Sequence, residues 1–249
     1  MTKKKIPLGN TFGKFAEEYQ RGRKEYPSYF FSFLKNLCPT SEFVLDIGCG
    51  TGIATRTLST LFPHVFACDI DDSMIVVAKE LSPPSIRYIV SDVVKMPYED
   101  KSFDLITAFA SLHWFCTPDA IKEIKRVLRK DGFLCVVNKI EKGSFRERLQ
   151  EIIEKVMDIS IEKTKLNFDP IKTLMDNNFP SVVEYSWDLV EEYTFDEAHH
   201  YIQSISAWHF VSDEKREEVF EKLSEYLQKT FPDKMAKRPI RLSCIIAYE

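Results

Sequence analysis

The chain has 249 residues, of which 44% are hydrophobic and 29% are charged, and its formal net charge is -4. This is the usage of a globular protein with a core of its own, so the composition excludes a largely disordered chain. The negative net charge disfavours nucleic acid as a partner, because holding a phosphate backbone needs a basic surface.

The N-terminal part of the chain is expected to form a helical segment at about residues 10–37. No apolar run of signal-peptide length follows Lys3–Lys5, and no segment has the roughly 18 uninterrupted apolar residues of a membrane span. The six cysteines stand singly in apolar stretches without a C-x-x-C pair, which is typical of buried reduced thiols. We therefore expect a cytoplasmic protein with no membrane partner and no metal.

From residue 43 onward, short apolar runs alternate with amphipathic helical patterns, as in βαβ units around a parallel sheet. Asp71 is expected to cap a helix that runs to about Leu81, and Thr117 to cap a helix over 118–129. The turn at Asp131-Gly132 then leads into the fifth strand. The five expected strands are 43–47, 65–69, 86–90, 103–109 and 133–138.

Beyond residue 140 the pattern becomes mostly helical. The segments Ser144–Glu147 and Thr194–Glu197 each predict a capping box that opens a helix, and Asp169 precedes a shorter helix. A strongly charged helix with an apolar inner face is expected over 213–231. Two further strands are expected at 182–189 and 240–248. The helical insertion between them, at about 191–236, is a candidate lid.

The segment Val44–Gly52 combines an apolar strand, a carboxylate at Asp46 and glycines at positions 48, 50 and 52. Glycine lets the backbone turn sharply and approach a ligand closely. A dinucleotide fingerprint, G-x-G-x-x-G, would need a glycine where Ile53 stands, so a dinucleotide site is disfavoured. Asp69 ends the second strand, where a carboxylate accepts both hydroxyls of a ribose. Both elements fit a nucleoside-type ligand.

Five motifs follow one another along the chain. They are Val44–Gly52, Asp69–Asp71, Ser91–Val93, Met96-Pro97 with Ser102–Asp104, and Arg126–Leu128 with Asp131-Gly132. In this order and spacing they resemble the motifs of the class I S-adenosylmethionine-dependent methyltransferases, and the resemblance covers about residues 10–140 closely. It implies an α/β fold with a Rossmann-like seven-stranded sheet, its last strand antiparallel, and helices on both faces.

The resemblance also implies one methyltransferase domain over residues 1–249. In this domain the N-terminal helical segment is expected at about 10–37 and the core at about 42–190 and 238–249. The helical lid is expected between the sixth and seventh strands, at about 191–236.

The implied cofactor is S-adenosylmethionine, and the resemblance assigns residues to its site. Those that would hold the methionine part are Asp46, Gly48, Cys49, Gly50, Thr51 and Gly52. Those that would hold the nucleoside are Asp69 at the ribose, Ile70 and Met74 on the adenine, and Asp92 and Val93 at the adenine edge. Ala110 and Ser111 would border the cofactor. Tyr19 and Arg23, four residues apart, share a helix face and would reach the cofactor carboxylate or an acidic substrate, unless they are a plain surface pair.

Two segments resemble small-molecule enzymes in particular, namely the trans-aconitate and malonyl-carrier-protein carboxyl O-methyltransferases. They are the N-terminal segment with Phe12-Gly13, Phe15-Ala16, Tyr19, Arg23 and Tyr26-Pro27, and the segment Ala110–Phe115. Tyr26, Trp114 and Trp208 are expected at the substrate cavity, with core packing as the alternative for Trp208. His113 is the candidate catalytic residue, as a general base or as a hydrogen-bond donor to the acceptor. The alternative is a polar wall residue that positions Trp114.

Methyl transfer from a sulfonium needs mainly alignment and exclusion of water. A carboxylate acceptor needs no deprotonation, whereas a phenol, hydroxyl or ammonium needs a base. Because no acid/base dyad is evident, a small-molecule carboxylate is the favoured acceptor. Three alternatives stay open: a catalytically silent cofactor-binding partner protein, a nucleotide-dependent oxidoreductase, and a methyltransferase that acts on RNA or protein. The oligomeric state is open too.

Overall fold

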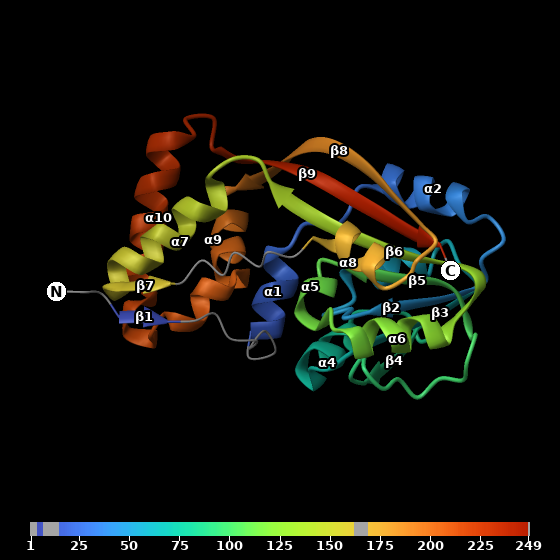
Figure 1. The fold of residues 1–249 in the computed structure, drawn as a ribbon. Helices are drawn as coiled ribbons and strands as arrows, with labels where there is room; N and C mark the ends of the chain where they lie inside the picture. The colour runs from blue at the N-terminus through green and yellow to red at the C-terminus, as the bar shows by residue number, and fades with distance from the viewer. Residues whose placement is uncertain (1–3, 7–14, 162–168, 249) are drawn as a thin grey trace. The chain divides into compact units, whose positions relative to one another are not determined.

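The computed structural model describes residues 4–6, 15–161 and 169–248 (Figure 1). The chain divides into two compact units, each built from three segments. Unit 1 consists of Met1–Lys24, Ile140–Lys165 and Asp188–Arg241, and unit 2 of Glu25–Lys139, Leu166–Trp187 and Leu242–Glu249. The expected N-terminal motif Phe12-Gly13 lies outside the described residues. The single domain with a core and a lid stays a prediction.

A seven-stranded mixed sheet has the strand order β4-β3-β2-β5-β6-β9-β8, and its last strands are antiparallel. The strands are β2 (Phe43–Ile47), β3 (His64–Asp69), β4 (Arg87–Val90), β5 (Phe103–Phe109), β6 (Leu128–Glu141), β8 (Ser181–Thr194) and β9 (Met235–Tyr248). The pairs from β4 to β6 are parallel, so the carboxyl ends of these strands share one edge of the sheet. The order reverses at β2, which has β3 on one side and β5 on the other. The predicted Rossmann-like α/β fold is confirmed.

Several predicted boundaries are wrong. β8 continues to Thr194 instead of ending at 189, β9 begins at Met235 instead of 240, and β6 starts before residue 133. The helix expected over 118–129 ends at Val127, and β6 begins at Leu128, so the Asp131-Gly132 turn lies inside the strand. Leu128 is 1% exposed and pairs with Phe103 of β5, so burial on the sheet outweighs the helical pattern. A register shift between Phe103 and Leu105 accommodates the extra residues.

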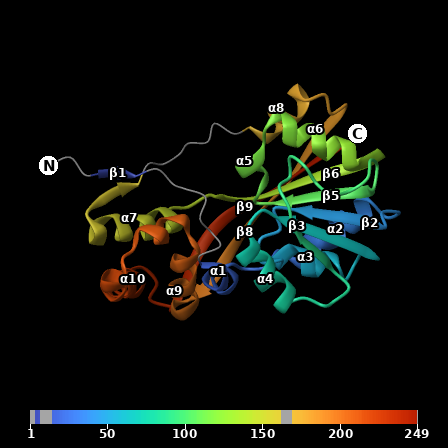
Figure 2. The same cartoon turned by 90° about the horizontal axis from the view of Figure 1, so that it is seen from below.

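Helices cover both faces of the sheet within unit 2, as Figure 2 shows. One face carries α2 (Ser28–Leu37), α3 (Ile53–Leu58) and α4 (Asp72–Glu80), and the other α5 (Leu112–Phe115), α6 (Pro118–Val127) and α8 (Pro170–Asp176). The apolar face of α6 packs into the core through Ile121 and Ile124, both fully buried. Two predicted caps are confirmed: the Asp71 carboxylate accepts from the amides of Ser73 and Met74, and the Thr117 hydroxyl from that of Ala120.

Unit 1 is mainly helical and has a core of its own. Its helices are α1 (Ala16–Gly22), α7 (Phe145–Met157), α9 (Phe195–Ser204), the 3-10 turns η2 (Ser206–Phe210) and η3 (Asp213–Lys215), and α10 (Arg216–Thr230). The short strands β1 (Lys4–Ile6) and β7 (Ile159–Ile161) pair in parallel. The segment from α9 to α10 lies between β8 and β9 in the chain, as predicted. Gly22 lets α1 approach α9 closely, because a Cβ there would lie 2.7 Å from the Cβ of Ser204.

The two predicted capping boxes of unit 1 differ. Thr194 forms a complete box with Glu197 at the start of α9. Ser144 precedes α7 but makes no side-chain cap hydrogen bond, so the predicted box at Ser144–Glu147 is wrong although its helix is present.

Across the described ranges, no helix is both long and apolar enough to cross a membrane. A cytoplasmic location stays a prediction.

Candidate functional site

The three glycines of the β2–α3 loop all have left-handed backbone conformations. Their φ angles are 62° at Gly48, 55° at Gly50 and 77° at Gly52. A Cβ at Gly48 would lie 2.7 Å from the Cβ of Ser111, so a side chain there would meet both backbone strain and a collision. The spacing of the glycines therefore sets the path of the loop at the carboxyl end of β2.

Asp46, two residues before this loop, is only 1% exposed. Its Oδ2 accepts from the Thr55 hydroxyl and its Oδ1 from the Thr107 hydroxyl, at 2.5 and 2.8 Å. Desolvation by burial raises the pKa of Asp46 to about 7, although both hydrogen bonds lower it. In this structure Asp46 joins β2 to α3 and β5. Its role in holding the methionine part of a cofactor stays a prediction.

Asp69 ends β3 and connects this strand to the glycine loop. Its Oδ2 accepts from the amide of Gly50 at 2.8 Å, and its Oδ1 from the amide of Asp71 at 3.0 Å. Burial raises the pKa of Asp69, and the two amide hydrogen bonds oppose that shift. The carboxylate thus stands next to the loop, at the point where the strand order reverses. This crevice is where open α/β sheets bind nucleotides.

Exposed apolar side chains follow the carboxyl ends of the neighbouring strands. Ile70 after β3 is 62% exposed, Val90 at the end of β4 is 53% exposed, and Val94 and Trp114 are each 40% exposed. Because β3, β4 and β5 belong to one parallel set, these side chains gather along one edge of the sheet. A flat apolar group such as a purine fits such a surface.

Three other predicted nucleoside contacts differ in exposure. Asp92 is exposed, and its Oδ1 accepts from the amide of Val94 at 3.0 Å. Met74 and Val93 are 3% and 5% exposed, so both belong mostly to the core beneath this edge. Their predicted adenine contacts are not tested by the structure.

The segment after β5 folds back over the glycine loop. Ala110 has a φ of 50°, and its amide donates to the carbonyl of Val137 at 2.7 Å. The Ser111 hydroxyl donates to the carbonyl of Ile47 at 2.8 Å, which fixes the start of α5 against the end of β2. On α5, the ring of half-buried His113 lies 4.7 Å from that of Trp114. The sequence-predicted Ala110–Trp114 segment therefore lies beside the loop.

The structure adds residues that the sequence reading missed. Thr55 and Thr107 hold Asp46, and Tyr88 and Phe115 close in on the glycines at 52 and 48. Thr107 is a polar residue inside the apolar strand β5 and lies opposite Asp46 in the register. A polar residue in an apolar strand is a sequence signal from which this contact could have been predicted. Thr51 is fully buried in the loop, and its hydroxyl has no hydrogen-bond partner among the described residues.

The predicted cavity residue Tyr26 lies in unit 2, where its ring packs edge-on against Phe109 at 4.8 Å. Tyr19, Arg23 and Trp208 belong to unit 1. Arg23 lies over the Tyr19 ring at 4.9 Å and donates to the carbonyl of Ser204 at 2.8 Å. Trp208 is 1% exposed. Their roles toward cofactor and substrate stay predictions.

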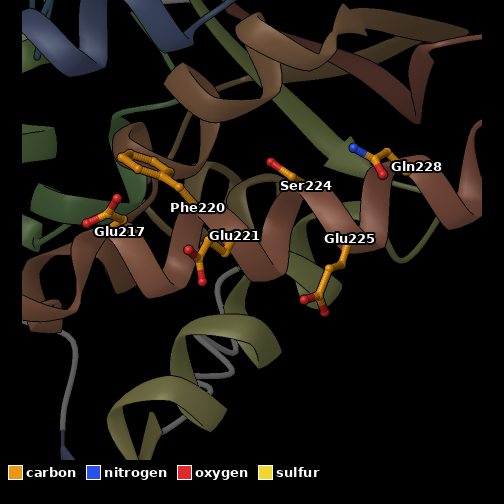
Figure 3. A pocket seen from close by; sticks show the side chains of 6 residues that line it. All are labelled: Glu217, Phe220, Glu221, Ser224, Glu225 and Gln228. Atoms are coloured by element: carbon orange, nitrogen blue, oxygen red, sulfur yellow. The ribbon is translucent and has the colours of Figure 1, made fainter.

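A shallow groove on α10 of unit 1 is shown in Figure 3. It is lined by Glu217, Phe220, Glu221, Ser224, Glu225 and Gln228. It contains none of the predicted site residues. Within the described parts of the chain, no group of three or more His, Cys, Asp or Glu side chains is arranged to hold a metal ion. All six cysteines are free, four of them buried and two half-buried.

Comparison with known proteins identifies the activity of the domain that contains this site. Residues 45–136, which contain the glycine loop, Asp69 and the segment after β5, match the model of a methyltransferase domain. This part of the chain is an S-adenosylmethionine-dependent methyltransferase domain. Its cofactor is S-adenosylmethionine. The nucleotide-dependent oxidoreductase alternative is thereby set aside.

Three proteins show how far the likeness of this methyltransferase extends. An uncharacterized methyltransferase of Schizosaccharomyces pombe is 26% identical over 231 residues, which is 90% of each chain. A malonyl-[acyl-carrier protein] O-methyltransferase of Legionella pneumophila is 28% identical over 135 residues, 51% of this chain and 48% of that one. A solved structure from Anaeromyxobacter dehalogenans, assigned as a type II methyltransferase, matches with a TM-score of 0.63 at 22% identity, over 91% of this chain and 96% of the other.

Proposed function

We propose that this methyltransferase acts on a small molecule and that the acceptor group is a carboxylate. The observation that carries the proposal is the edge of the sheet at which Asp69, the glycine loop and exposed apolar side chains come together. This edge suits a small nucleoside cofactor. The net charge of -4 argues against an RNA acceptor, because no overall basic charge is available to hold it.

The residues at this edge fit the cofactor chemically. Asp69 offers a carboxylate for the ribose hydroxyls, and Ile70 offers an apolar surface for the adenine. Among the described residues the Thr51 hydroxyl has no hydrogen-bond partner, so it is a polar group within the loop that a ligand can bind. When bound, S-adenosylmethionine supplies an activated methyl group on a positively charged sulfur.

The chain's own contribution to the reaction is alignment and exclusion of water. The Ser111–Ile47 hydrogen bond fixes the start of α5, and with it the positions of His113 and Trp114 beside the loop. A carboxylate acceptor is already a nucleophile at neutral pH, so His113 need only position it or donate a hydrogen bond to it. A hydroxyl or ammonium acceptor would require His113 to act as a base.

The small-molecule subgroup is supported by sequence likeness. The N-terminal segment and the segment Ala110–Phe115 resemble carboxyl O-methyltransferases, and a relative named as a malonyl-[acyl-carrier protein] O-methyltransferase matches about half of the chain. We propose a free or carrier-bound organic acid as the acceptor class. Tyr26, Trp114 and Trp208 remain the proposed residues of its cavity.

The test has two stages. Calorimetric titration of the purified chain with S-adenosylhomocysteine should give saturable binding with a micromolar or tighter dissociation constant. Release of S-adenosylhomocysteine is then measured with a panel of small carboxylic acids, the corresponding acyl-carrier thioesters, and matched amines and alcohols. Turnover on an acid but not on its amide supports the proposal.

Each alternative has its own signature in the same assay. Cofactor binding without turnover on any acceptor, cell extracts included, would favour a catalytically silent partner protein. Turnover only with an RNA or protein fraction would replace the small-molecule acceptor by a macromolecule.

A further inference from the structure

Two arginines of unit 1 lie over the ring of a single buried tyrosine, and a third interacts with it electrostatically. The guanidinium carbons of Arg23 and Arg238 lie 5.4 and 5.1 Å from the centre of the Tyr201 ring. Arg146, in the first turn of α7, lies within electrostatic range of Tyr201 and of both other arginines. Its neighbour Phe145 stacks on Tyr201 with the ring centres 5.8 Å apart, which places the start of α7 beside the tyrosine. Two guanidinium groups therefore lie over one ring, and a third positive charge lies within electrostatic range of it.

Arg238 is neutralised inside this cluster. Its Nε binds Glu141 Oε2 at 2.6 Å and its Nη1 binds Glu191 Oε2 at 2.8 Å, and the three side chains are mostly buried. The Tyr193 hydroxyl donates to the same Glu191 oxygen at 2.7 Å. Arg238 is thus a structural part of unit 1 with two carboxylates of its own.

Arg23 and Arg146 have no such partners. Arg23 donates through Nη2 to the neutral carbonyl of Ser204, and its buried Nε has no hydrogen-bond partner in the part of the chain that the structure describes. Arg146 has an exposed side chain, and only its backbone amide reaches Glu141, at 3.4 Å. Among the described residues, neither guanidinium forms an ion pair with a carboxylate. Three guanidinium groups thus face two carboxylates, so the cluster carries one excess positive charge.

The Tyr201 hydroxyl group also lacks a hydrogen-bond partner among the described residues. Tyr201 is 0% exposed. A buried hydroxyl without a partner is rare, because it loses its hydrogen bonds to water and gains none in return. An excess cation and an unused donor therefore occur together, and one anion would satisfy both.

We propose that Arg23, Arg146 and Tyr201 form a binding site for the carboxylate of a small organic acid. The guanidinium group presents paired N–H donors that match the two oxygens of a carboxylate, and the hydroxyl adds a further donor. Arg146 is the accessible side of this site, and Tyr201 is its buried end. The inference rests on the proposed function for the class of ligand, which is an organic acid. It adds Arg146 and Tyr201 as residues of unit 1 that recognise such an acid by charge.

The test compares Arg146→Gln and Tyr201→Phe with a matched control, Arg148→Gln. Arg148 lies on the same helix, is 55% exposed and pairs with Glu151 at the surface, so its replacement makes the same change in net charge. The full-length protein is titrated by calorimetry with citrate and succinate, with succinamide as the uncharged analogue. S-adenosylhomocysteine is titrated separately, and the unfolding free energy of each variant is measured in urea.

We expect citrate to bind the parent protein and Arg148→Gln with equal affinity, and Arg146→Gln about 10- to 100-fold more weakly. Tyr201→Phe should also bind citrate more weakly, yet be at least as stable as the parent, because its hydroxyl has no bond to lose. If Tyr201 had only a structural role, Tyr201→Phe would be less stable than the parent and would bind citrate with the same affinity. The affinity for S-adenosylhomocysteine should stay the same in all three variants.

Several results would overturn the site. These are equal citrate affinity in Arg146→Gln and Arg148→Gln, succinamide binding as tightly as succinate, and no binding of either acid by a parent protein that binds S-adenosylhomocysteine. A parallel loss of S-adenosylhomocysteine affinity in Arg146→Gln would assign the cluster to the cofactor carboxylate instead of the acceptor. Failure of the parent to bind S-adenosylhomocysteine would count against the proposed function alone.

Discussion

Asp46 shows how burial and hydrogen bonding compete at a single carboxyl group. Two threonine hydroxyls donate to it, yet desolvation dominates and raises its pKa from 3.8 to about 7. Because the folded pKa lies above the unfolded one, the folded protein binds the proton more tightly. Asp46 therefore lowers the free energy of unfolding as the pH rises from about 4 to 7.

Replacing Asp46 by Asn should remove this pH dependence. The amide keeps an oxygen and a polar nitrogen for the two threonines, but it cannot ionise. We expect the variant to gain stability relative to the parent between pH 4.5 and 8, by up to about 4 kcal/mol. Urea unfolding at several pH values measures the difference in unfolding free energy between variant and parent. A difference that stays constant across the pH range would contradict the raised pKa.

Asp104 is a control, because its pKa is shifted in the direction opposite to that of Asp46. Burial raises its pKa, but hydrogen bonds from the amides of Phe43 and Glu42 and the Arg129 guanidinium outweigh burial, and the net pKa is lowered. A lowered carboxyl pKa stabilises the fold above the unfolded value and is lost in acid. Asp104→Asn should therefore lose stability at neutral pH and approach the parent at acid pH.

Asp69 is the residue on which cofactor affinity should depend most. If its carboxylate accepts the ribose hydroxyls, Asp69→Ala should weaken S-adenosylhomocysteine binding by roughly 1 to 3 kcal/mol, the range for hydrogen bonds to a charged group. Asp72→Ala, at an exposed position of the following helix, is the matched control and should bind normally. Equal affinities of the two variants in calorimetry would remove Asp69 from the ribose site.

His113→Gln separates the two roles proposed for this histidine. Glutamine keeps a polar side chain that can donate a hydrogen bond, but it cannot act as a base. For a carboxylate acceptor we expect kcat to fall by less than about tenfold, with an unchanged pH profile. A fall of about 100-fold or more, with loss of the limb of the pH profile that a titrating base produces, would identify His113 as a general base.

Two segments with the same cap pattern behave differently once packed. Thr194 and Ser144 are both followed three residues later by Glu, yet only Thr194 forms the capping box. Thr194→Ala should therefore cost about 1 kcal/mol of stability, whereas Ser144→Ala should change it by only a few tenths. Urea unfolding of the two variants measures this, and equal losses would show that the Ser144 cap also forms in solution.

The described chain combines two units with separate cores, and the residues proposed for the cofactor site, other than Tyr19 and Arg23, lie in unit 2. Bound S-adenosylhomocysteine should therefore slow hydrogen exchange mainly at 46–52, 69–74 and 110–115. Mass spectrometry of exchanged peptides measures this. Protection confined to unit 1 would contradict the site. Stabilisation by the ligand should follow mass action, about 2.7 kcal/mol at a concentration 100 times the dissociation constant.

The local sequence pattern was enough to predict the bounds of strands and the caps of helices that follow a single pattern along their whole length. The apolar runs of β2 and β5 have the predicted bounds, and the Asp71 and Thr117 caps form as expected. The start of β6 was misjudged because Leu128 continues the helical spacing, and its pairing with Phe103 cannot be read from that spacing. The Asp46–Thr55–Thr107 cluster was missed for the same reason, since its members come from β2, α3 and β5.

The sequence by itself determined the α/β fold and the nucleoside character of the cofactor site. Glycine spacing and the distance to Asp69 are local constraints, and a backbone that must turn at left-handed φ leaves few other residues possible. Tertiary structure decided which charges are paired. Arg23, Arg146, Tyr201 and Arg238 come from widely separated segments. Only their packing in unit 1 leaves a cation without a carboxylate and a buried hydroxyl without a hydrogen bond among the described residues. Burial and pairing depend on neighbours that are distant in the chain, and a local pattern does not contain them.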